Sequence, residues 1–187
     1  MPRKEALFYP CGGSPSTVTR GFRVLLDDPV SLTVERRDAL GLRNCDDLKI
    51  ATPDKADLSD SMALLDAIHA QCKAFKPQLI VIDALYLFTP SRQNAGNDSA
   101  SMGPVMAKLN AIAEALQAAV LLIAHDKKDG SDVAGSHVIR AAVKARLHLT
   151  RPQWGGTDEE ADDGKRYLTV TTKMTAETKH LLRCQGA

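Results

Sequence analysis

The sequence predicts an α/β fold with a mainly parallel sheet flanked by helices. Two wholly apolar runs, LIVI at 79–82 and AVLLIA at 119–124, are typical of strands buried in a parallel sheet. Each run is followed by a polar residue, Asp83 or His125. Residues 101–117 lie between the runs and repeat apolar side chains at helical spacing, which predicts a right-handed β-α-β unit. Asp83 and His125 are therefore expected at the same edge of the sheet.

The composition is that of an ordinary globular domain. The chain has 187 residues, of which 44% are hydrophobic and 25% charged, and we expect one domain over residues 1–187. A formal net charge of +1 gives no overall attraction to nucleic acid. The four cysteines form no CxxC pair, and the sequence shows neither a signal peptide nor an apolar run of membrane-spanning length. These features predict a cytoplasmic protein that makes no use of a membrane.

The N-terminal segment predicts a strand, a glycine turn and a helix. Residues 6–9 are an apolar run, Gly12 and Gly13 turn the chain, and Ser14 is a favourable first residue for a helix that reaches Leu26. This order of elements is the setting of a phosphate cradle, so the two glycines are candidate cofactor contacts. A plain turn between strand and helix is the alternative, because the sequence contains no GxxxxGK[ST] motif.

The remaining elements follow from the same periodicities. Two polar loops, at 89–97 and 126–135, lie between some of these elements. The second is charged and contains a pair of lysines, which is either solvated or a phosphate contact. The expected elements are a short helix within 27–44, a strand at 48–51, helices at 57–75 and 137–144, a strand at 145–150, and a hairpin of 167–172 with 181–184 at the sheet edge.

Asp83 is the candidate metal ligand. A carboxylate at the carboxyl end of a buried parallel strand lies where open α/β sheets bind ligands, and it can hold Mg²⁺ or its bound water. This is the chemistry of a Walker B aspartate. The alternative is a residue that only caps the following turn. His125 is open in the same way: it can contact a phosphate or a bound water, or it can be an ordinary loop residue.

Four segments in this order carry a resemblance to a known family. They are LFYPCGGSPSTVTRGFRVL, LIVIDALYLF, GNDSASMGPVMAKLNAIAEALQAAVLLIAHDKKDG, and GSHVIRAAVKARLHLTR with YLTVTTK. The chain resembles the RecA-like AAA family ATPases of the plasmid RepA-type hexameric helicase group, of phage and mobile-element type. The first segment resembles the family's second strand, turn and helix, the second its Walker B strand, and the third its sensor strand.

The resemblance implies a partial RecA-like P-loop NTPase core that binds ATP and Mg²⁺ and assembles into a ring on single-stranded DNA in a replication-associated role. The residues to which it gives roles are Asp83 for Mg²⁺, His125 as sensor, Lys128 as the lysine after the sensor strand, Lys173 near a lysine of the last strands, and Arg92 with Lys127 for DNA phosphates.

Departures from the family pattern predict impaired hydrolysis. The P-loop strand and helix should precede Ala6, the catalytic glutamate matches Gly12, and the arginine finger matches Ala134. We therefore expect that this chain alone does not hydrolyse ATP at a meaningful rate. Loss of the P-loop strand is further expected to leave an open edge beside the 79–83 strand, which favours a homo-oligomer or a partner subunit.

The sequence leaves three interpretations open. The first is a truncated or degenerate relative of the RepA-type ATPases that retains its Walker B aspartate. The second is a non-catalytic pseudo-ATPase that binds single-stranded DNA or a partner subunit. The third is an anion site at Cys11, Gly12 and Gly13 that is independent of ATP.

Overall fold

The computed structural model describes nine stretches of the chain, and these group into two compact units. The units are Met1–Ile139 and Arg140–Ala187, and each is considered by itself. The expectation of a single domain stays a prediction. The described residues are 6–8, 16–18, 20–26, 29–43, 45–52, 60–85, 99–124, 137–150 and 165–183.

The first unit is built on a four-stranded parallel sheet in the order β4-β3-β5-β6, as the mainly parallel fold class predicts. A separate antiparallel pair, β1 with β2, precedes it. The elements are β1 (Ala6–Phe8), β2 (Ser16–Val18), β3 (Gly21–Leu25), α1 (Val30–Ala39), β4 (Leu48–Ala51), α2 (Ser61–Phe75), β5 (Leu79–Asp83), α3 (Ser99–Leu116) and β6 (Ala119–Ile123).

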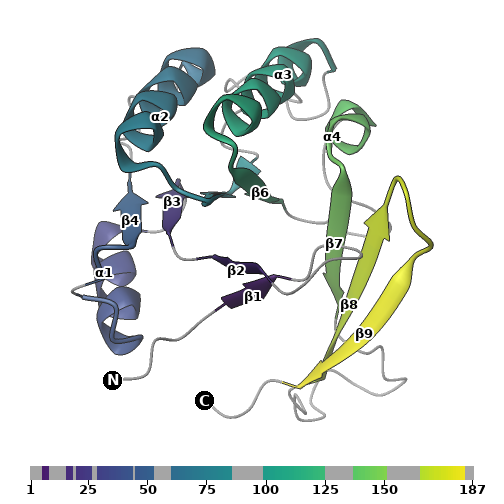
Figure 1. The fold of residues 1–187 in the computed structure, drawn as a ribbon, viewed down its shortest axis with the longest axis horizontal. Coiled ribbons are helices and arrows are strands. Elements are labelled where there is room, and N and C mark those ends of the chain that lie inside the picture. Colours follow the sequence, from purple (N-terminus) through teal and green to yellow (C-terminus); the bar gives the residue numbers. More distant parts are fainter. Residues whose placement is uncertain are drawn as a thin grey trace. The chain divides into compact units, whose positions relative to one another are not determined.

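Helices cover both faces of this sheet. Figure 1 shows α2 and α3 side by side over one face. Alternate strand residues supply the buried side of that face, because side chains along a strand point to opposite sides. They are Phe22, Val24, Ile80 and Ile82. On the opposite face, side chains of α1 line a common cavity with side chains of β3 and β4.

Helix α2 shows how the sequence sets its own boundaries. Its N-cap is Asp60, whose side chain accepts hydrogen bonds from the backbone N–H groups of Met62 and Ala63, each at 3.0 Å. Its C-cap is Lys76 in the left-handed conformation. The helix predicted within 57–75 is confirmed, and its apolar residues at helical spacing form a buried face: Leu64, Leu65, Ile68 and Cys72.

The helix expected from Ser14 to Leu26 is wrong. Residues Gly21–Leu25 form β3, which pairs with β4 on one side and with β5 on the other. Phe22 and Val24 are buried at a spacing of two, whereas Phe22 and Leu25 had suggested a helical spacing of three. Parallel pairing along both edges of the strand therefore decides a segment whose local periodicity fits either structure.

The neighbours of β5 also differ from expectation. The strand expected at 6–9 is β1, which pairs with β2 and not with the parallel sheet. Both edges of β5 are occupied, by β3 and by β6, so the predicted open edge beside the 79–83 strand is wrong. In the described part of the sheet, the outermost strands are β4 and β6.

The second unit contains a three-stranded antiparallel sheet in the order β7-β8-β9. It follows α4 (His137–Ala142), which agrees with the helix predicted there. The strands are β7 (Ala145–Thr150), β8 (Lys165–Thr172) and β9 (Thr178–Arg183). The predicted hairpin of β8 and β9 is confirmed, but it pairs with β7 in a sheet of its own and is not an edge of the parallel sheet.

Among the helices in the described ranges, none has both the length and the hydropathy needed to cross a bilayer.

Candidate nucleotide site at the carboxyl edge of the parallel sheet

The carboxyl ends of three strands meet at Asp83. Leu25 of β3 is the register partner of Asp83 on one side, and Ile123 of β6 is its register partner on the other. The expected common edge of the 79–82 and 119–124 strands is thereby confirmed. The chain leaves all three strands at this edge, where open parallel sheets bind ligands.

The carboxylate of Asp83 forms an ion pair with an arginine of the neighbouring strand. Nη2 of Arg23 donates to Oδ2 of Asp83 at 2.7 Å. The two residues lie on the same face of the sheet, because Arg23 is two positions before Leu25 along β3. The side chains are 41% and 25% exposed, so the pair is partly withdrawn from water. Sequence reasoning missed Arg23, since nothing in its local pattern marks it.

Strand β3 stays beside β5 up to its last residues. The backbone N–H of Leu26 donates to the backbone carbonyl of Asp83 at 2.7 Å. Asp27 and Asp28 come next in the sequence and lie outside the described residues. An apolar run followed by a carboxylate is the same pattern that singled out Asp83, and it could have identified these two residues.

The match of the catalytic glutamate to Gly12 follows from the resemblance of residues 7–25 to the family's second strand, turn and helix, and Gly12 lies outside the described residues, so that match stays a prediction. The strand beside β5 is β3 and not the strand at 6–8. The residues that follow the neighbouring strand are thus acidic, in Asp27 and Asp28, and not glycine.

A small cavity lies on the same face of the sheet, between α1 and strands β3 and β4. Its volume is about 60 Å³, enough for a few water molecules and too small for a nucleotide. Arg23, Arg36 and Arg37 line it together with Thr33 and aliphatic side chains, and none of the described residues that line it is acidic. The described residues that line the cavity therefore supply no carboxylate to Arg23.

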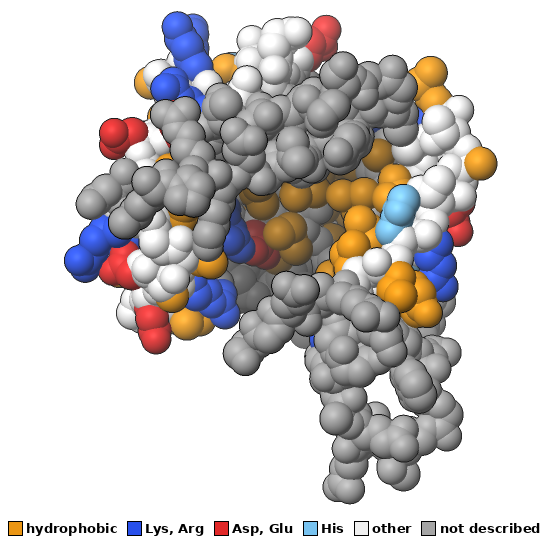
Figure 2. Space-filling view, turned by 60° about the horizontal axis from the view of Figure 1, so that its bottom comes forward, with side chains coloured by type: hydrophobic (Ala, Val, Ile, Leu, Met, Phe, Trp, Pro, Cys, Tyr) orange, Lys and Arg blue, Asp and Glu red, His pale blue; other side chains and the backbone are white. Residues whose placement is uncertain are grey.

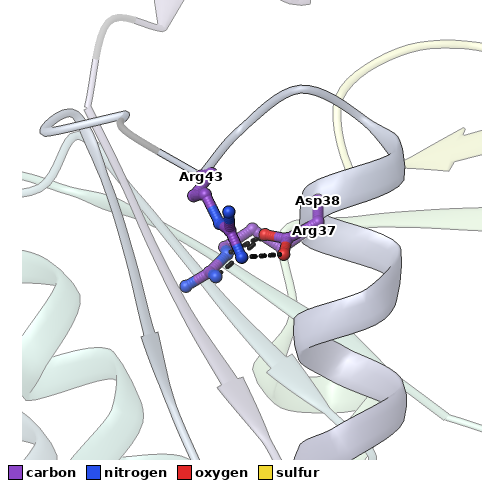
Figure 3. Close-up of polar contacts among 3 residues, drawn as sticks. All are labelled: Arg37, Asp38 and Arg43. Atoms are coloured by element: carbon purple, nitrogen blue, oxygen red, sulfur yellow. Dashed lines mark hydrogen bonds and ion pairs between the residues drawn. The ribbon is translucent and has the colours of Figure 1, made fainter.

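At the end of α1, two arginines pair with one aspartate, and one of them, Arg37, also lines the cavity. Figure 3 shows Arg37, Asp38 and Arg43 together. Nε and Nη2 of Arg37 donate to Oδ1 of Asp38 at 3.0 and 2.9 Å, and Nη2 of Arg43 lies 3.1 Å from Oδ2 of Asp38. Asp38 thus links the last turn of α1 to the turn that leads toward β4.

Most of the other predicted site residues fall outside the described part of the chain. They are Gly12, Gly13, Arg92, His125, Lys127 and Lys128. In the segment that leads to His125, Lys127 and Lys128, the last described residue is Ala124, directly after β6.

Lys173 has a structural partner in the second unit. Its Nζ donates to the backbone carbonyl of Ala141 near the end of α4. A cation at this position satisfies a carbonyl at a helix C-terminus. The predicted role of Lys173 in cofactor binding stays a prediction.

The charges on the described surface are mixed. On the face in Figure 2, Lys and Arg side chains lie among Asp and Glu side chains, and the described residues there form no broad basic patch. This agrees with the formal net charge of +1. Any contact to nucleic-acid phosphates would have to come from individual loops, and such contacts stay a prediction.

The comparison with protein families agrees with the topology of the first unit. Residues 7–131 match the AAA domain, and this segment contains the whole parallel sheet and the helices between its strands. The chain belongs to the AAA domain family. Membership implies nucleotide binding of the ATPase type. No curated protein matches the chain.

The donor chemistry at Asp83 fits the magnesium ion that accompanies nucleotides in such domains. Mg²⁺ is commonly held by one or two carboxylates, with substrate phosphates and water completing its ligands. Asp83 offers one carboxylate at the centre of the edge, and its sole hydrogen-bond partner among the described residues is Arg23. No described residue donates a hydrogen bond to Oδ1 of Asp83, which can therefore take a ligand without breaking a contact among them.

Proposed function

We propose that this AAA domain binds Mg²⁺–ATP at the carboxyl edge of the β4-β3-β5-β6 sheet, with Asp83 as the Walker B aspartate. The observation that carries the proposal is the register of three parallel strands, in which Leu25, Asp83 and Ile123 stand abreast. A central carboxylate with chain ends on both sides suits a metal–phosphate site.

We assign a different role to each of the candidate residues at the carboxyl ends of these strands. The ion, when bound, neutralises charge on the phosphate oxygens. Asp83 holds the ion or one of its waters. Asp27 and Asp28 are the candidates for accepting a proton from the attacking water, because they follow the strand beside Asp83. His125 is the candidate sensor, and Lys128 a candidate phosphate contact.

Hydrolysis by this polypeptide alone is expected to be slow. Its sequence contains no GxxxxGK[ST] motif, and Ala134 stands where the resemblance places an arginine finger. An arginine finger is worth on the order of 10³–10⁵ in rate in comparable enzymes. We propose a RepA-type ATPase relative whose binding of nucleotide exceeds its capacity to turn it over.

Nucleotide binding is the direct test of this proposal. A fluorescent ATP analogue is titrated into the purified chain in Mg²⁺, with unlabelled ATP, GTP and AMP as competitors. Saturable binding that ATP displaces better than AMP is expected, because the phosphates supply the contacts. If the analogue does not bind, the non-catalytic partner-binding alternative takes the place of the ATPase relative.

The helicase part of the proposal concerns single-stranded DNA. Arg92 and Lys127 are the candidate phosphate contacts, and they lie in the loops at 89–97 and 126–135. Binding through such contacts must weaken with salt, with a slope of about −0.7 in log K against log salt for each contact. Arg92→Gln and Lys127→Gln should each reduce this slope. DNA binding that does not respond to salt, or no binding at all, would leave assembly with a partner subunit.

A further inference from the structure

Arg23 and Asp83 are not an optimised structural ion pair. The contact joins one nitrogen to one oxygen, whereas the strongest arginine–carboxylate pairs use two parallel hydrogen bonds. Nε of Arg23 is buried and has no hydrogen-bond partner among the described residues. A buried N–H without a partner is unfavourable, so this position of Arg23 leaves part of its hydrogen-bonding capacity unused.

The surroundings of Arg23 direct its head group toward the sheet edge. On the α1 side, the cavity that it lines is bounded by Arg36, Arg37 and uncharged residues. Arg37 is itself paired with Asp38, and the described residues that line the cavity offer Arg23 no carboxylate partner. Among the described residues, the carboxylate that accepts a hydrogen bond from Arg23 is that of Asp83. Asp83 lies at the carboxyl end of β5, where the chain leaves the sheet.

The same carboxylate therefore has two competing uses. A guanidinium at 2.7 Å from Oδ2 occupies one of the lone-pair positions that a cation requires. It also places a positive charge next to any ion that binds at Oδ1, which lowers the affinity for that ion.

We propose that Arg23 is a built-in counter-ion of Asp83 that a divalent cation must displace, and that it lowers the affinity of the empty site for the cation alone. A nucleotide phosphate supplies a second anion for the released guanidinium, so cation and nucleotide favour each other's binding. This inference rests on the proposed function, since it takes Asp83 as the metal ligand.

The test measures Mn²⁺ binding without nucleotide, by the loss of the free-ion electron paramagnetic resonance signal. The variants are Arg23→Gln and Asp83→Asn. Arg20→Gln is the matched control, because Arg20 loses the same charge, lies before β3 at the other end of the strand, and pairs with Asp47. Binding that persists in Asp83→Asn measures the background from other acidic residues, including the DEEADD stretch at 158–163.

Arg23→Gln is expected to bind Mn²⁺ about 3- to 10-fold more tightly than the wild type, as for the loss of one partly exposed ion pair and its charge. Arg20→Gln should stay within about twofold of the wild type, and Asp83→Asn should remove the site. If Arg23→Gln lowers the melting temperature strongly, Arg23→Met replaces it, because methionine keeps an apolar stem.

Two results would overturn the inference, and they are distinct. Unchanged or weaker Mn²⁺ binding in Arg23→Gln, with the site still lost in Asp83→Asn, rejects the counter-ion role and leaves Asp83 as the metal ligand. The absence of any Asp83-dependent Mn²⁺ binding in all variants rejects the role and also contradicts the proposed metal site.

Discussion

Arg23 of β3 and Asp83 of β5 are 60 positions apart in the sequence, yet Nη2 of one donates to Oδ2 of the other at 2.7 Å. Parallel pairing of their strands brings them together at the edge where three chain segments leave the sheet. The pair thus lies at the carboxyl ends of the parallel strands, where the nucleotide site is proposed.

The Arg23–Asp83 pair is expected to contribute little to stability. Arg23→Met should change the free energy of unfolding by less than about 1 kcal/mol, because the ion pair is partly exposed to water and is made by one hydrogen bond. Urea unfolding followed by circular dichroism measures this change. A loss several times larger would mean that the pair is a structural contact first, and would weaken its assignment to the site.

The core between the sheet and α2 should respond far more strongly. Leu65→Ala is expected to lower the free energy of unfolding by about 2–5 kcal/mol, because Leu65 has no exposed surface and its truncation leaves a cavity. Met62 lies on the same helix and is 39% exposed, so Met62→Ala is the matched control and should cost much less. Equal losses in the two variants would contradict the described packing of α2.

The buried thiol of Cys72 is expected to lower the stability of the fold at alkaline pH. Burial raises the pKa of the Cys72 thiol to about 11 from an ordinary value of 9.0, and the positive charge of Lys49 opposes part of the rise. The folded state therefore favours the neutral thiol, while the unfolded chain releases its proton nearer pH 9.

The sign of the pH effect follows from the raised pKa. The stabilising contribution is complete below about pH 9 and is lost as the pH rises through about 11. Wild-type stability should fall more steeply over this range than that of Cys72→Ala, in which the thiol is absent and the other titrating groups are unchanged. Parallel profiles for the two proteins would show that the thiol is not buried as described.

The success of the sequence predictions depended on how local the determining interactions are. Helix α2 and strand β5 are predicted correctly because apolar residues at helical spacing within 57–75 and an uninterrupted apolar run at 79–82 leave few alternatives. Strand β3 was mistaken for a helix because Phe22, Val24 and Leu25 satisfy both periods over five residues. Its pairing with β4 and β5, which decides the matter, involves residues far away in the sequence.

The site was predictable to the same extent. The apolar run before Asp83 predicts that this residue lies at the carboxyl end of a parallel strand. The register of Asp83 with Ile123 confirms this position. Arg23 could not be foreseen, because its partner is defined by strand order and not by spacing. The wrong assignment of β3 also hid Asp27 and Asp28, which gain significance only once β3 is known to lie beside β5.

We propose that Asp83 holds the magnesium ion of a bound nucleotide. The most direct test of this role measures the affinity for the fluorescent ATP analogue in Mg²⁺ and in EDTA, for the wild type and for Asp83→Asn. The wild type should bind at least about tenfold more tightly in Mg²⁺ than in EDTA, as expected when an ion neutralises phosphate charge, and Asp83→Asn should lose most of this difference. A difference that Asp83→Asn fully retains, in a variant that folds normally, would contradict the claim.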